Sequence, residues 1–414
     1  MEVEVDFSGG WPLAGDLRAP EAALAATELE AVLGASGGAG AEILLSHREG
    51  AGDGFRRQVA PGQLRLEGDS PRGLLCGAYA TLEELGARWD WPGQDASPGR
   101  VRARLAARRE DAPALEGRCL VLGERALLEE ADDWIVWAAR RRLNAIFVHV
   151  STRPDPAGAA PEALWRQCRD RAAALARERG VAIEHGGHLL PELLSTEDLR
   201  AMAKGGAPSR EGLGILEEHV RAHPEADVVH LWGADLPAGG GGGQAASEAA
   251  LRTANAVAEV VEGVSPRAQV AYLAYHDTED VPRGVAPRPN VCLVFAPRER
   301  CYEHALTDPG CRRNARHREL FCAQVEHFAA AGAAPARVFE YWFDAILFAG
   351  GVPDLTQTMA RDLAFYHQAG AHTVQMLMTG HGRSPRPHPN LPAFARLAWS
   401  PQPRAGPTCA HPPT

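Results

Sequence analysis

Carboxyl, phenol and imidazole groups follow several apolar segments of this sequence, at points where buried strands would end. Asp235 closes "VVHLWGAD", and Tyr275 and His276 follow "AYLA". Glu340 stands late in the apolar segment "VFEYWFD", next to Tyr341. Aromatic neighbours disfavour a charged carboxylate, so we expect the pKa of Glu340 to be raised, as a general acid needs. We expect Asp235, beside glycines and water, to stay ionised and to orient a substrate or stabilise its charge.

Histidine, arginine and tryptophan add candidates for contact with a substrate. His185 and His188 form H-x-x-H in "EHGGHLL" but lack the glutamate of H-E-x-x-H, so we expect no metal ion and no cofactor. The further candidates are Trp232, Trp342, Arg300 and His304, and the other acids at strand ends are Glu184, Asp277 and Asp344. Each candidate has a structural alternative. Tryptophans are more often core residues, and arginines, acids and histidines often form surface ion pairs or lie in loops.

The elements that must position these residues alternate between strand and helix. The strand-like segments are "RCLVLG", "NAIFVHVS", "VAIEHGG", "ADVVHLWGAD", "AQVAYLAYHD", "NVCLVFAP", "ARVFEYWFD" and "HTVQMLMTG". This alternation predicts a (β/α)8 TIM-type barrel over residues 115–400, with its functional groups at the C-terminal strand ends. The link between the fifth and sixth strands is too short for a helix. An open doubly wound sheet is the alternative, although no G-x-G-x-x-G follows a strand.

The regions outside the barrel are predicted from their local patterns. Residues 1–108 read as a small α/β domain, and the Arg-rich stretch at residues 100–112 reads as a linker to the barrel. Residues 401–414 are proline-rich, and we expect a disordered tail. The run Gly239–Gly243 lacks the Gly-Lys-Ser/Thr of a phosphate-binding loop, so we expect a flexible loop, and a mobile lid beside a binding cleft is the alternative.

Composition excludes several classes of function. The formal net charge is −10 and no Lys/Arg-rich run occurs, so a nucleic-acid partner is not expected. No apolar run is long enough to span a membrane, and the first residues lack a signal-peptide pattern, so the chain as it stands is expected to be cytoplasmic. The eight cysteines are scattered without a C-x-x-C pair, which favours reduced thiols. Pairing of Cys301 with Cys311 is the alternative for an exported protein.

Two stretches resemble known glycoside hydrolases. "GLLCGAYATLEELGARWDWPG" resembles the signature that ends the small α/β domain in front of the barrel in β-hexosaminidase-like and α-glucuronidase-like enzymes. "LAYHDTEDVPRGVAPRPNVCLVFAPRERCYEHALTDPGCRRN", followed by "VFEYWFD", resembles the bacterial family called domain of unknown function 4838. Some members of that family form glycoside hydrolase family 163, the endo-β-N-acetylglucosaminidases, whose relatives are often exported. The resemblance covers most of residues 65–400.

The resemblance implies a site and a reaction. Asp235 falls on the family's acid, while Leu236 stands where family 20 hexosaminidases carry a second acid, and glycines replace the family's cysteine-containing loop. The implied function is hydrolysis of a glycosidic bond, in an N-acetylhexosamine-containing glycan, by two carboxylates or with help from the substrate's acetamido group. The implied catalytic residues are Glu340 as proton donor and Asp235. Two alternatives remain open: a non-catalytic carbohydrate-binding barrel, and a metal-dependent barrel hydrolase that uses His185 and His188. The expected partner is a glycan or oligosaccharide, and the oligomeric state is left open.

Overall fold

The computed structural model describes residues 1–7, 10–33, 41–96, 102–153, 159–235, 242–380 and 387–401. Residues 236–241, which include Leu236 and most of the glycine run, and residues 402–414 of the proline-rich tail lie outside the described residues. Backbone contacts divide the chain into two compact units. The first comprises Met1–Glu116, Asp132–Asn144 and Arg171–Val181, and the second comprises Gly117–Ala131, Ala145–Asp170 and Ala182–Thr414.

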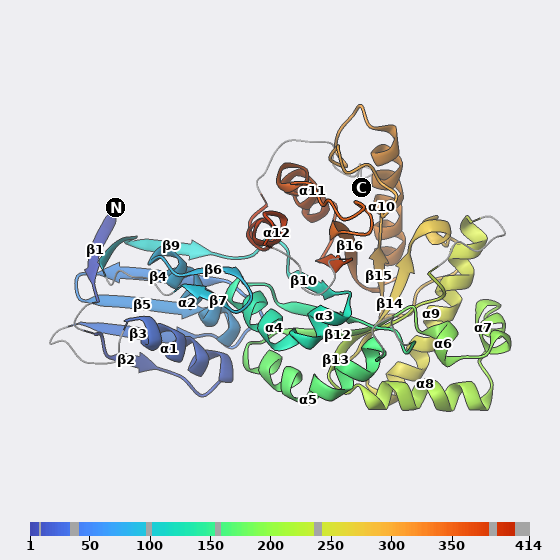
Figure 1. Cartoon of the computed structure of the whole chain (residues 1–414), viewed down its shortest axis with the longest axis horizontal. Coiled ribbons are helices and arrows are strands. Elements are labelled where there is room, and N and C mark those ends of the chain that lie inside the picture. Colours follow the sequence, from blue (N-terminus) through green and yellow to red (C-terminus); the bar gives the residue numbers. More distant parts are fainter. Residues whose placement is uncertain are drawn as a thin grey trace. The chain divides into compact units, whose positions relative to one another are not determined.

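The first unit contains a five-stranded mixed sheet in the order β2-β3-β5-β4-β9 (Figure 1). The elements of its Met1–Glu116 segment are β1 (Glu2–Asp6), β2 (Leu13–Gly15), α1 (Pro20–Leu33), β3 (Glu42–His47), β4 (Phe55–Ala60), β5 (Gln63–Gly68), α2 (Pro71–Glu84), β6 (Arg88–Trp91), β7 (Gln94–Ala96), β8 (Arg102–Ala106) and β9 (Arg108–Asp111). Helix α2 begins after Ser70, whose hydroxyl accepts the N–H of Gly73. Gly77 lets this helix lie directly on the sheet, because a Cβ there would stand 2.7 Å from Leu66.

The Arg-rich stretch that reads as a linker is part of this unit. Strand β8 pairs antiparallel with β1, and β9 pairs antiparallel with β4 and so forms one edge of the five-stranded sheet. The expectation of an unstructured linker at residues 100–112 is therefore wrong for residues 102–111. The arginines here lie mostly on the exposed faces of two edge strands. An edge strand with one solvated face carries as much charge as a linker does, so its sequence can be mistaken for one.

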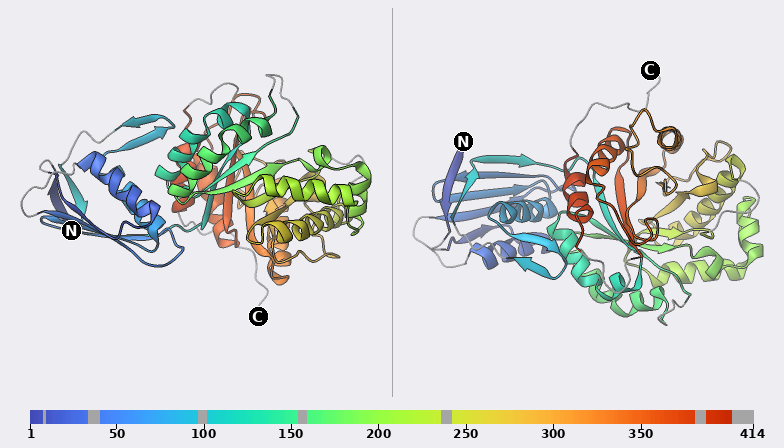
Figure 2. Two further views of the ribbon diagram at one scale, coloured as in Figure 1. Left: turned by 90° about the horizontal axis from the view of Figure 1, so that it is seen from below. Right: turned by 45° about the horizontal axis from the view of Figure 1, so that its top comes forward.

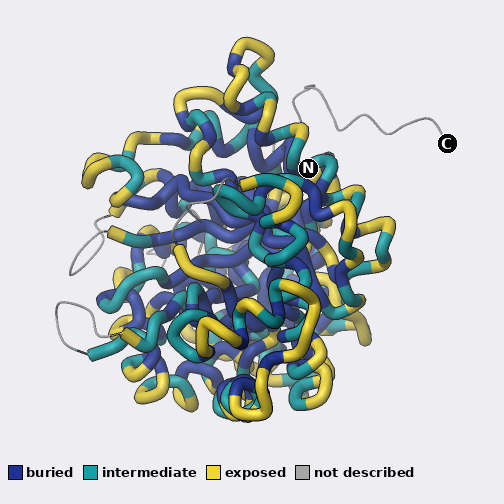
Figure 3. The backbone as a smooth tube through the Cα atoms, turned by 90° about the vertical axis from the view of Figure 1, so that its right-hand side faces the viewer, coloured by how far each residue is buried: buried dark blue, intermediate teal, exposed yellow. Residues whose placement is uncertain are grey.

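The second unit contains a closed barrel of eight parallel strands in chain order, as the alternation predicts (Figure 2). The strands are β10 (Gly117–Leu122), β11 (Ala145–His149), β12 (Ala182–Gly187), β13 (Ala226–Leu231), β14 (Gln269–Ala274), β15 (Val291–Phe295), β16 (Ala334–Asp344) and β17 (Thr373–Thr379). The barrel closes where β17 pairs with β10. Buried segments lie inward in Figure 3, and exposed segments follow loops and outer helix surfaces.

The helices that follow these strands along the chain vary in length. They are α3 (Arg125–Glu129), α4 (Ala131–Arg140), α5 (Pro161–Glu178), α6 (Leu190–Leu193), α7 (Thr196–Ala203), α8 (Arg210–Ala222), α9 (Gln244–Val264), α10 (Arg312–Ala330), α11 (Thr356–Gln368) and α12 (Asn390–Trp399). Between β14 and β15 the chain forms only a short 3-10 turn, η1 (His276–Thr278), so the short fifth-to-sixth link is confirmed.

Side-chain amides hold that helix-free link. Asn255 on α9 donates to the carbonyl of Ala286, and Asn290 donates to the carbonyl of Ala258 on α9. Gln324 on α10 is fully buried and donates to the carbonyl of Glu279. The link is therefore fixed to the helices on both sides by hydrogen bonds to two of its backbone carbonyls and from its Asn290 side chain.

The barrel interior carries charge instead of a purely apolar filling. Glu184 on β12 accepts from Arg337 on β16 at 2.7 Å, from Gln375 on β17 at 2.6 Å, and lies 2.8 Å from Nε2 of His230 on β13. All but Arg337 are almost completely buried, and the positive Arg337 and the hydrogen bonds lower the pKa of Glu184 against the effect of burial. Glu184 and Arg337 thus mark the inward-facing positions of their strands.

Two expectations about the whole chain can be compared with the described residues. Cys76, Cys119, Cys168, Cys292, Cys301 and Cys311 are free thiols, so Cys301 and Cys311 do not pair. Cys322 departs from the expectation of reduced thiols, because it is disulfide-bonded. No helix in the described ranges is both long and apolar enough to cross a membrane.

Candidate active site

The C-terminal ends of the barrel strands surround a cavity of about 300 Å³, here called the polar cavity. Its lining comes from strand ends and from the loops that follow them. The lining residues are Gly123, His149, His188, Trp232, Asp235, Leu273, Tyr275, His276, Arg298, Phe339, Tyr341, Asp344, Ile346, Leu377 and Thr379. This is the end of the barrel at which such folds carry their functional groups.

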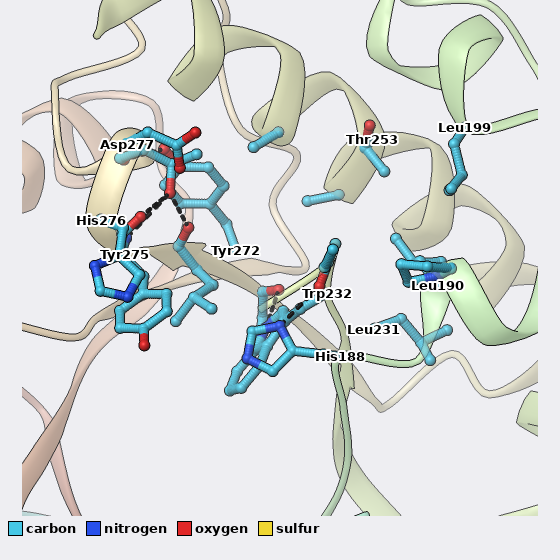
Figure 4. A pocket seen from close by; sticks show the side chains of 18 residues that line it. His188, Leu190, Leu199, Leu231, Trp232, Thr253, Tyr272, Tyr275, His276 and Asp277 are labelled. Carbon is cyan, nitrogen blue, oxygen red and sulfur yellow. Dashed lines mark hydrogen bonds between the residues drawn. The ribbon is translucent and has the colours of Figure 1, made fainter. Parts of the chain in front are cut away.

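A second cavity of about 360 Å³, here called the apolar cavity, shares part of this wall. Both cavities are lined by His188, Trp232, Leu273, Tyr275 and His276. Figure 4 shows His188 lying over Trp232, with Tyr275 and His276 on one side and the aliphatic Leu190, Leu199 and Leu231 on the other. A polar and an apolar compartment therefore meet at one aromatic wall.

Asp235 lies in the polar cavity, where sequence analysis expects it. It follows β13 and its side chain is 61% exposed, with Oδ1 at 3.6 Å from Nε2 of His188. His188 Nδ1 lies 2.7 Å from the carbonyl oxygen of Gly233, which fixes the ring. Burial raises the pKa of the Tyr275 hydroxyl, and the neighbouring negative charge of Asp235 raises it further. Tyr275 is consequently a neutral hydrogen-bond donor beside the acid.

Asp344 is the second carboxylate of the polar cavity. It ends β16 and is almost completely buried. Its Oδ1 accepts the backbone N–H groups of Ile346 at 2.8 Å and Leu347 at 3.0 Å, and its Oδ2 lies 3.6 Å from Nη2 of Arg298. Asp344 is one of the strand-end acids noted in the sequence. The sequence predicts Glu340 as the catalytic acid instead, because Glu340 has aromatic neighbours.

Aromatic rings line the polar cavity together with the two carboxylates. The rings of Tyr275 and Tyr341 are stacked with centroids 6.5 Å apart, and the Arg298 guanidinium lies 5.8 Å over the Tyr341 ring. Trp232 is held by a hydrogen bond from its Nε1 to the carbonyl of Ala271. The predicted candidates Trp232, Tyr275 and Tyr341 thus lie together at the cavity. His276 also lines it and occupies the left-handed region at φ 51°.

His149 belongs to the cavity and is absent from the predicted site. It ends β11 and lines the polar cavity, and the centroid of its ring lies 6.0 Å from that of His188. Burial lowers the pKa of His149 to about 3, and its histidine neighbours add to the effect. The imidazole is therefore neutral at physiological pH. The signal in the sequence was a polar residue near the end of "NAIFVHVS", the same signal that singles out Tyr275.

Glu340 does not lie in this cavity, which corrects the predicted role of proton donor. Its carboxylate is fully buried behind β16, where Tyr366 of α11 donates to it at 2.5 Å and Nε of Arg300 lies 3.3 Å away. Arg300 also pairs with the buried Asp362. Burial raises the pKa of Glu340 to about 7, although the charge of Arg300 opposes this. The raised pKa is as predicted, but the group faces a helix instead of the cavity, and Arg300 is likewise not at the site.

Three further predicted contacts are placed elsewhere. His185 is buried behind β12, with Nε2 at 2.9 Å from Glu162, so it does not share a site with His188. Trp342 packs against Phe394 of α12. His304 is exposed, with Nδ1 at 3.2 Å from Sγ of Cys301. None of these three lines the polar or the apolar cavity in the part of the chain that the structure describes.

The fold is similar to that of several glycoside hydrolases of low sequence identity. The β-N-acetylhexosaminidase from Bacteroides fragilis NCTC 9343 matches with a TM-score of 0.61 and 13% identity, over 98% of this chain and 90% of that chain. The GH20 β-N-acetylhexosaminidase from Streptomyces coelicolor A3(2) matches with a TM-score of 0.60 and 14% identity, over 97% and 88%.

A GH138 enzyme targeting pectin rhamnogalacturonan II is also similar, with a TM-score of 0.61 and 11% identity. The match covers 95% of this chain, which spans only 51% of that enzyme. No curated protein matches the chain. These comparisons establish the fold class, a TIM-type barrel with a preceding α/β unit like those of hexosaminidases. Residues 240–405 match the family model described as Domain of unknown function (DUF4838), so the predicted resemblance to that family and to the hexosaminidase-like barrel is confirmed.

Proposed function

We propose that this protein is a glycoside hydrolase, and that the polar cavity is its active site. One observation carries the proposal. Asp235 and Asp344, from the ends of the fourth and seventh barrel strands, line one cavity together with stacked aromatic rings. Hydrolysis of a glycosidic bond needs two such groups, and aromatic rings are suited to the apolar faces of sugars.

Asp344 is assigned the role of a fixed acceptor. Two backbone N–H groups hold its Oδ1, and Oδ2 lies 3.6 Å from Nη2 of Arg298, which also lines the cavity. A carboxylate so placed accepts a hydrogen bond from a substrate hydroxyl or amide and stabilises positive charge at the anomeric carbon. The nearby Arg298 keeps this carboxylate in one orientation.

Asp235 is assigned the role of proton donor in place of Glu340. This replaces the expectation from the sequence that Asp235 stays ionised, and the reactive enzyme is the form in which its carboxyl group is protonated. Its side chain is largely exposed, so it can recover a proton from water between turnovers. In the bond-breaking step the proton moves from Asp235 to the leaving oxygen as the bond from that oxygen to the anomeric carbon breaks. Tyr275, beside Asp235, keeps a neutral hydroxyl that is available to donate a hydrogen bond to the substrate.

The preferred substrate is an N-acetylhexosamine-containing glycan. The apolar cavity adjoins the polar one at Trp232 and Tyr275, and this arrangement suits a sugar ring that carries a small apolar group. In the substrate-assisted form of the reaction, the acetamido oxygen bonds to the anomeric carbon as the leaving group departs, and water then opens that adduct. The hexosaminidase names of two structural neighbours support the same choice.

The experiment is a substrate panel measured on matched variants. Chromogenic N-acetylhexosaminides, chromogenic uronides and an N-glycan are incubated with the wild type, Asp235→Asn, Asp344→Asn and the control Asp170→Asn, whose exposed acid lies on α5 away from the site. We expect turnover of an N-acetylhexosaminide, with kcat lowered at least about a hundredfold in each site variant and unchanged in the control.

Two outcomes would change the proposal. Full activity in Asp235→Asn on a confirmed substrate would show that the assigned site is wrong. Binding of sugar without turnover of any of them would favour the carbohydrate-binding barrel, since Asp344 would then serve only to hold its own loop. A hydrolase with a metal ion between His185 and His188 is not supported, because the structure buries His185 behind the strand and leaves His188 in the cavity.

A further inference from the structure

Three histidines and a glutamate lie together behind the barrel wall, outside both cavities. This group, here called the histidine cluster, consists of His185, His219, His223 and Glu162. The nitrogen ligand atoms of the three histidines all lie within 4.8 Å of one another. None of the four residues lines the polar or the apolar cavity in the described chain.

The elements explain why these residues meet. His219 and His223 are four residues apart at the end of α8, so they project from one side of the helix. His185 stands on β12 next to the inward-facing Glu184, so it points outward, toward the helices. Glu162 is the second residue of α5. Two helices and one strand of the second unit therefore contribute one group each or more.

The Glu162 carboxylate bridges two of the histidines. Its Oε2 lies 2.9 Å from Nε2 of His185, and its Oε1 lies 2.8 Å from Nε2 of His223. The rings of His185 and His223 are stacked, with centroids 3.7 Å apart and planes inclined by 16°. The Nε2 atoms of His185 and His223 thus both lie against the Glu162 carboxylate.

His219 is the member of the cluster whose burial is not explained by a hydrogen bond. Its side chain is 5% exposed, and its Nε2 is buried without a hydrogen-bond partner among the described residues. Its ring lies 5.0 Å from that of His223 and 5.7 Å from that of His185. A buried polar atom without a partner calls for an explanation, and a bound ion that completes the site is one such explanation.

We propose that the histidine cluster binds a divalent transition-metal ion, best Zn²⁺, through one nitrogen of each histidine and one oxygen of Glu162. Three imidazoles and a carboxylate form a donor set that suits zinc, whereas magnesium and calcium prefer oxygen ligands alone. Zinc–nitrogen bonds of about 2.0 Å require the ligand atoms to draw together by side-chain movements on the order of 1 Å. Glu162 also pairs with Arg166, whose half-exposed side chain can turn to solvent when the ion arrives.

The proposed ion is structural. Four protein ligands fill a tetrahedral shell and leave no position for a reacting water. The ion would join α5, α8 and β12, so its binding energy would add to the stability of the barrel wall. The proposal does not rest on the proposed glycosidase activity, and its test uses binding and melting only.

The test uses the full-length chain after removal of metal with a chelator. Zn²⁺ binding is measured by competition with a chromophoric chelator, and melting is followed with and without Zn²⁺. The variants are His219→Gln, the histidine control His327→Gln on α10, and Cys301→Ser, which disables the Cys301–His304–Cys311 group as a second zinc-binding cluster. His219→Gln removes one ligand while the hydrogen bonds of Glu162 remain.

We expect one equivalent of Zn²⁺ to bind to the wild type and both controls and to raise their melting temperature. In His219→Gln, affinity falls at least about tenfold and the melting shift is lost, while the metal-free forms melt together. Co²⁺ in the wild type should give the visible absorption of a tetrahedral site, which needs no variant to fold. The proposal is overturned if the wild type binds no Zn²⁺, if His219→Gln binds it equally well, or if Cys301→Ser abolishes binding.

Discussion

Tyr366 donates its hydroxyl to Glu340 at 2.5 Å, across the layer between β16 and α11 and outside the barrel. Both side chains are fully buried, and Arg300 lies against the same carboxylate. The acid that stands among aromatic residues in the sequence is therefore part of a polar connection between a strand and its covering helix.

Glu340→Gln should reduce stability without reducing activity. The amide oxygen still accepts from Tyr366, but the charge beside Arg300 is lost, and we expect a cost of about 1–3 kcal/mol in the free energy of unfolding. The measurement is urea denaturation, with the exposed Glu262→Gln as control, which should change stability by less than about 0.5 kcal/mol. A loss of kcat with unchanged stability would return Glu340 to the active site.

His149 should make stability depend on pH in the acid range. Its pKa is lowered from 6.5 to about 3, so between these values the unfolded chain binds a proton that the native chain does not. Its contribution to stability is thus complete above pH 6.5 and is lost as the pH falls toward 3. Relative to His149→Gln, the wild type should lose up to about 1.4 kcal/mol per pH unit in this range.

The measurement for His149 is denaturation of both proteins at a series of pH values. Ring NMR signals of His149 that stay in the neutral form at pH 5 would agree with the prediction. Titration near pH 6.5, or parallel stability curves for the two proteins, would contradict it.

Gly186→Ala should disrupt the barrel, whereas the same change at Gly214 should be harmless. Gly186 on β12 has φ +132°, and a Cβ there would stand 1.9 Å from the carbonyl oxygen of His230 on β13. We expect a loss of about 3 kcal/mol or more, or failure to fold. Gly214 is exposed within α8 with no neighbour near its Cβ, so alanine should stabilise by about 0.5–1 kcal/mol. A stable Gly186→Ala protein would contradict the pairing of β12 with β13.

The order of the barrel strands could be predicted from the sequence because each strand is a short apolar segment between helices. The missing helix between β14 and β15 was also visible as a short proline-rich link. The edge strands β8 and β9 were not visible, since their alternating arginines resemble a linker. The sequence reveals a strand only when apolar residues stand out clearly from polar ones, either as a continuous run or as a strict alternation.

The facing of residues within a barrel strand could not be predicted in this way. In β16, Arg337 and Tyr341 face inward or toward the cavity, whereas Glu340 and Trp342 face the covering helices. Both faces of such a strand are buried, so the apolar pattern carries no alternation that assigns a side chain to either face. His185 was misplaced for the same reason. The spacing of His219 and His223 was the signal that could have found its true neighbours.

The helix-free link between β14 and β15 is exposed to slow chemical damage, because amide side chains hold it in place. Its position depends on the amides of Asn255, Asn290 and Gln324, each of which donates to a backbone carbonyl. Hydrolysis of such an amide leaves a carboxylate that can only accept, opposite an oxygen that also only accepts. Asparagine and glutamine are among the residues that heat damages first. On prolonged heating, deamidation would therefore loosen the loop that carries His276. The lining of the cavity would then change before the barrel unfolds.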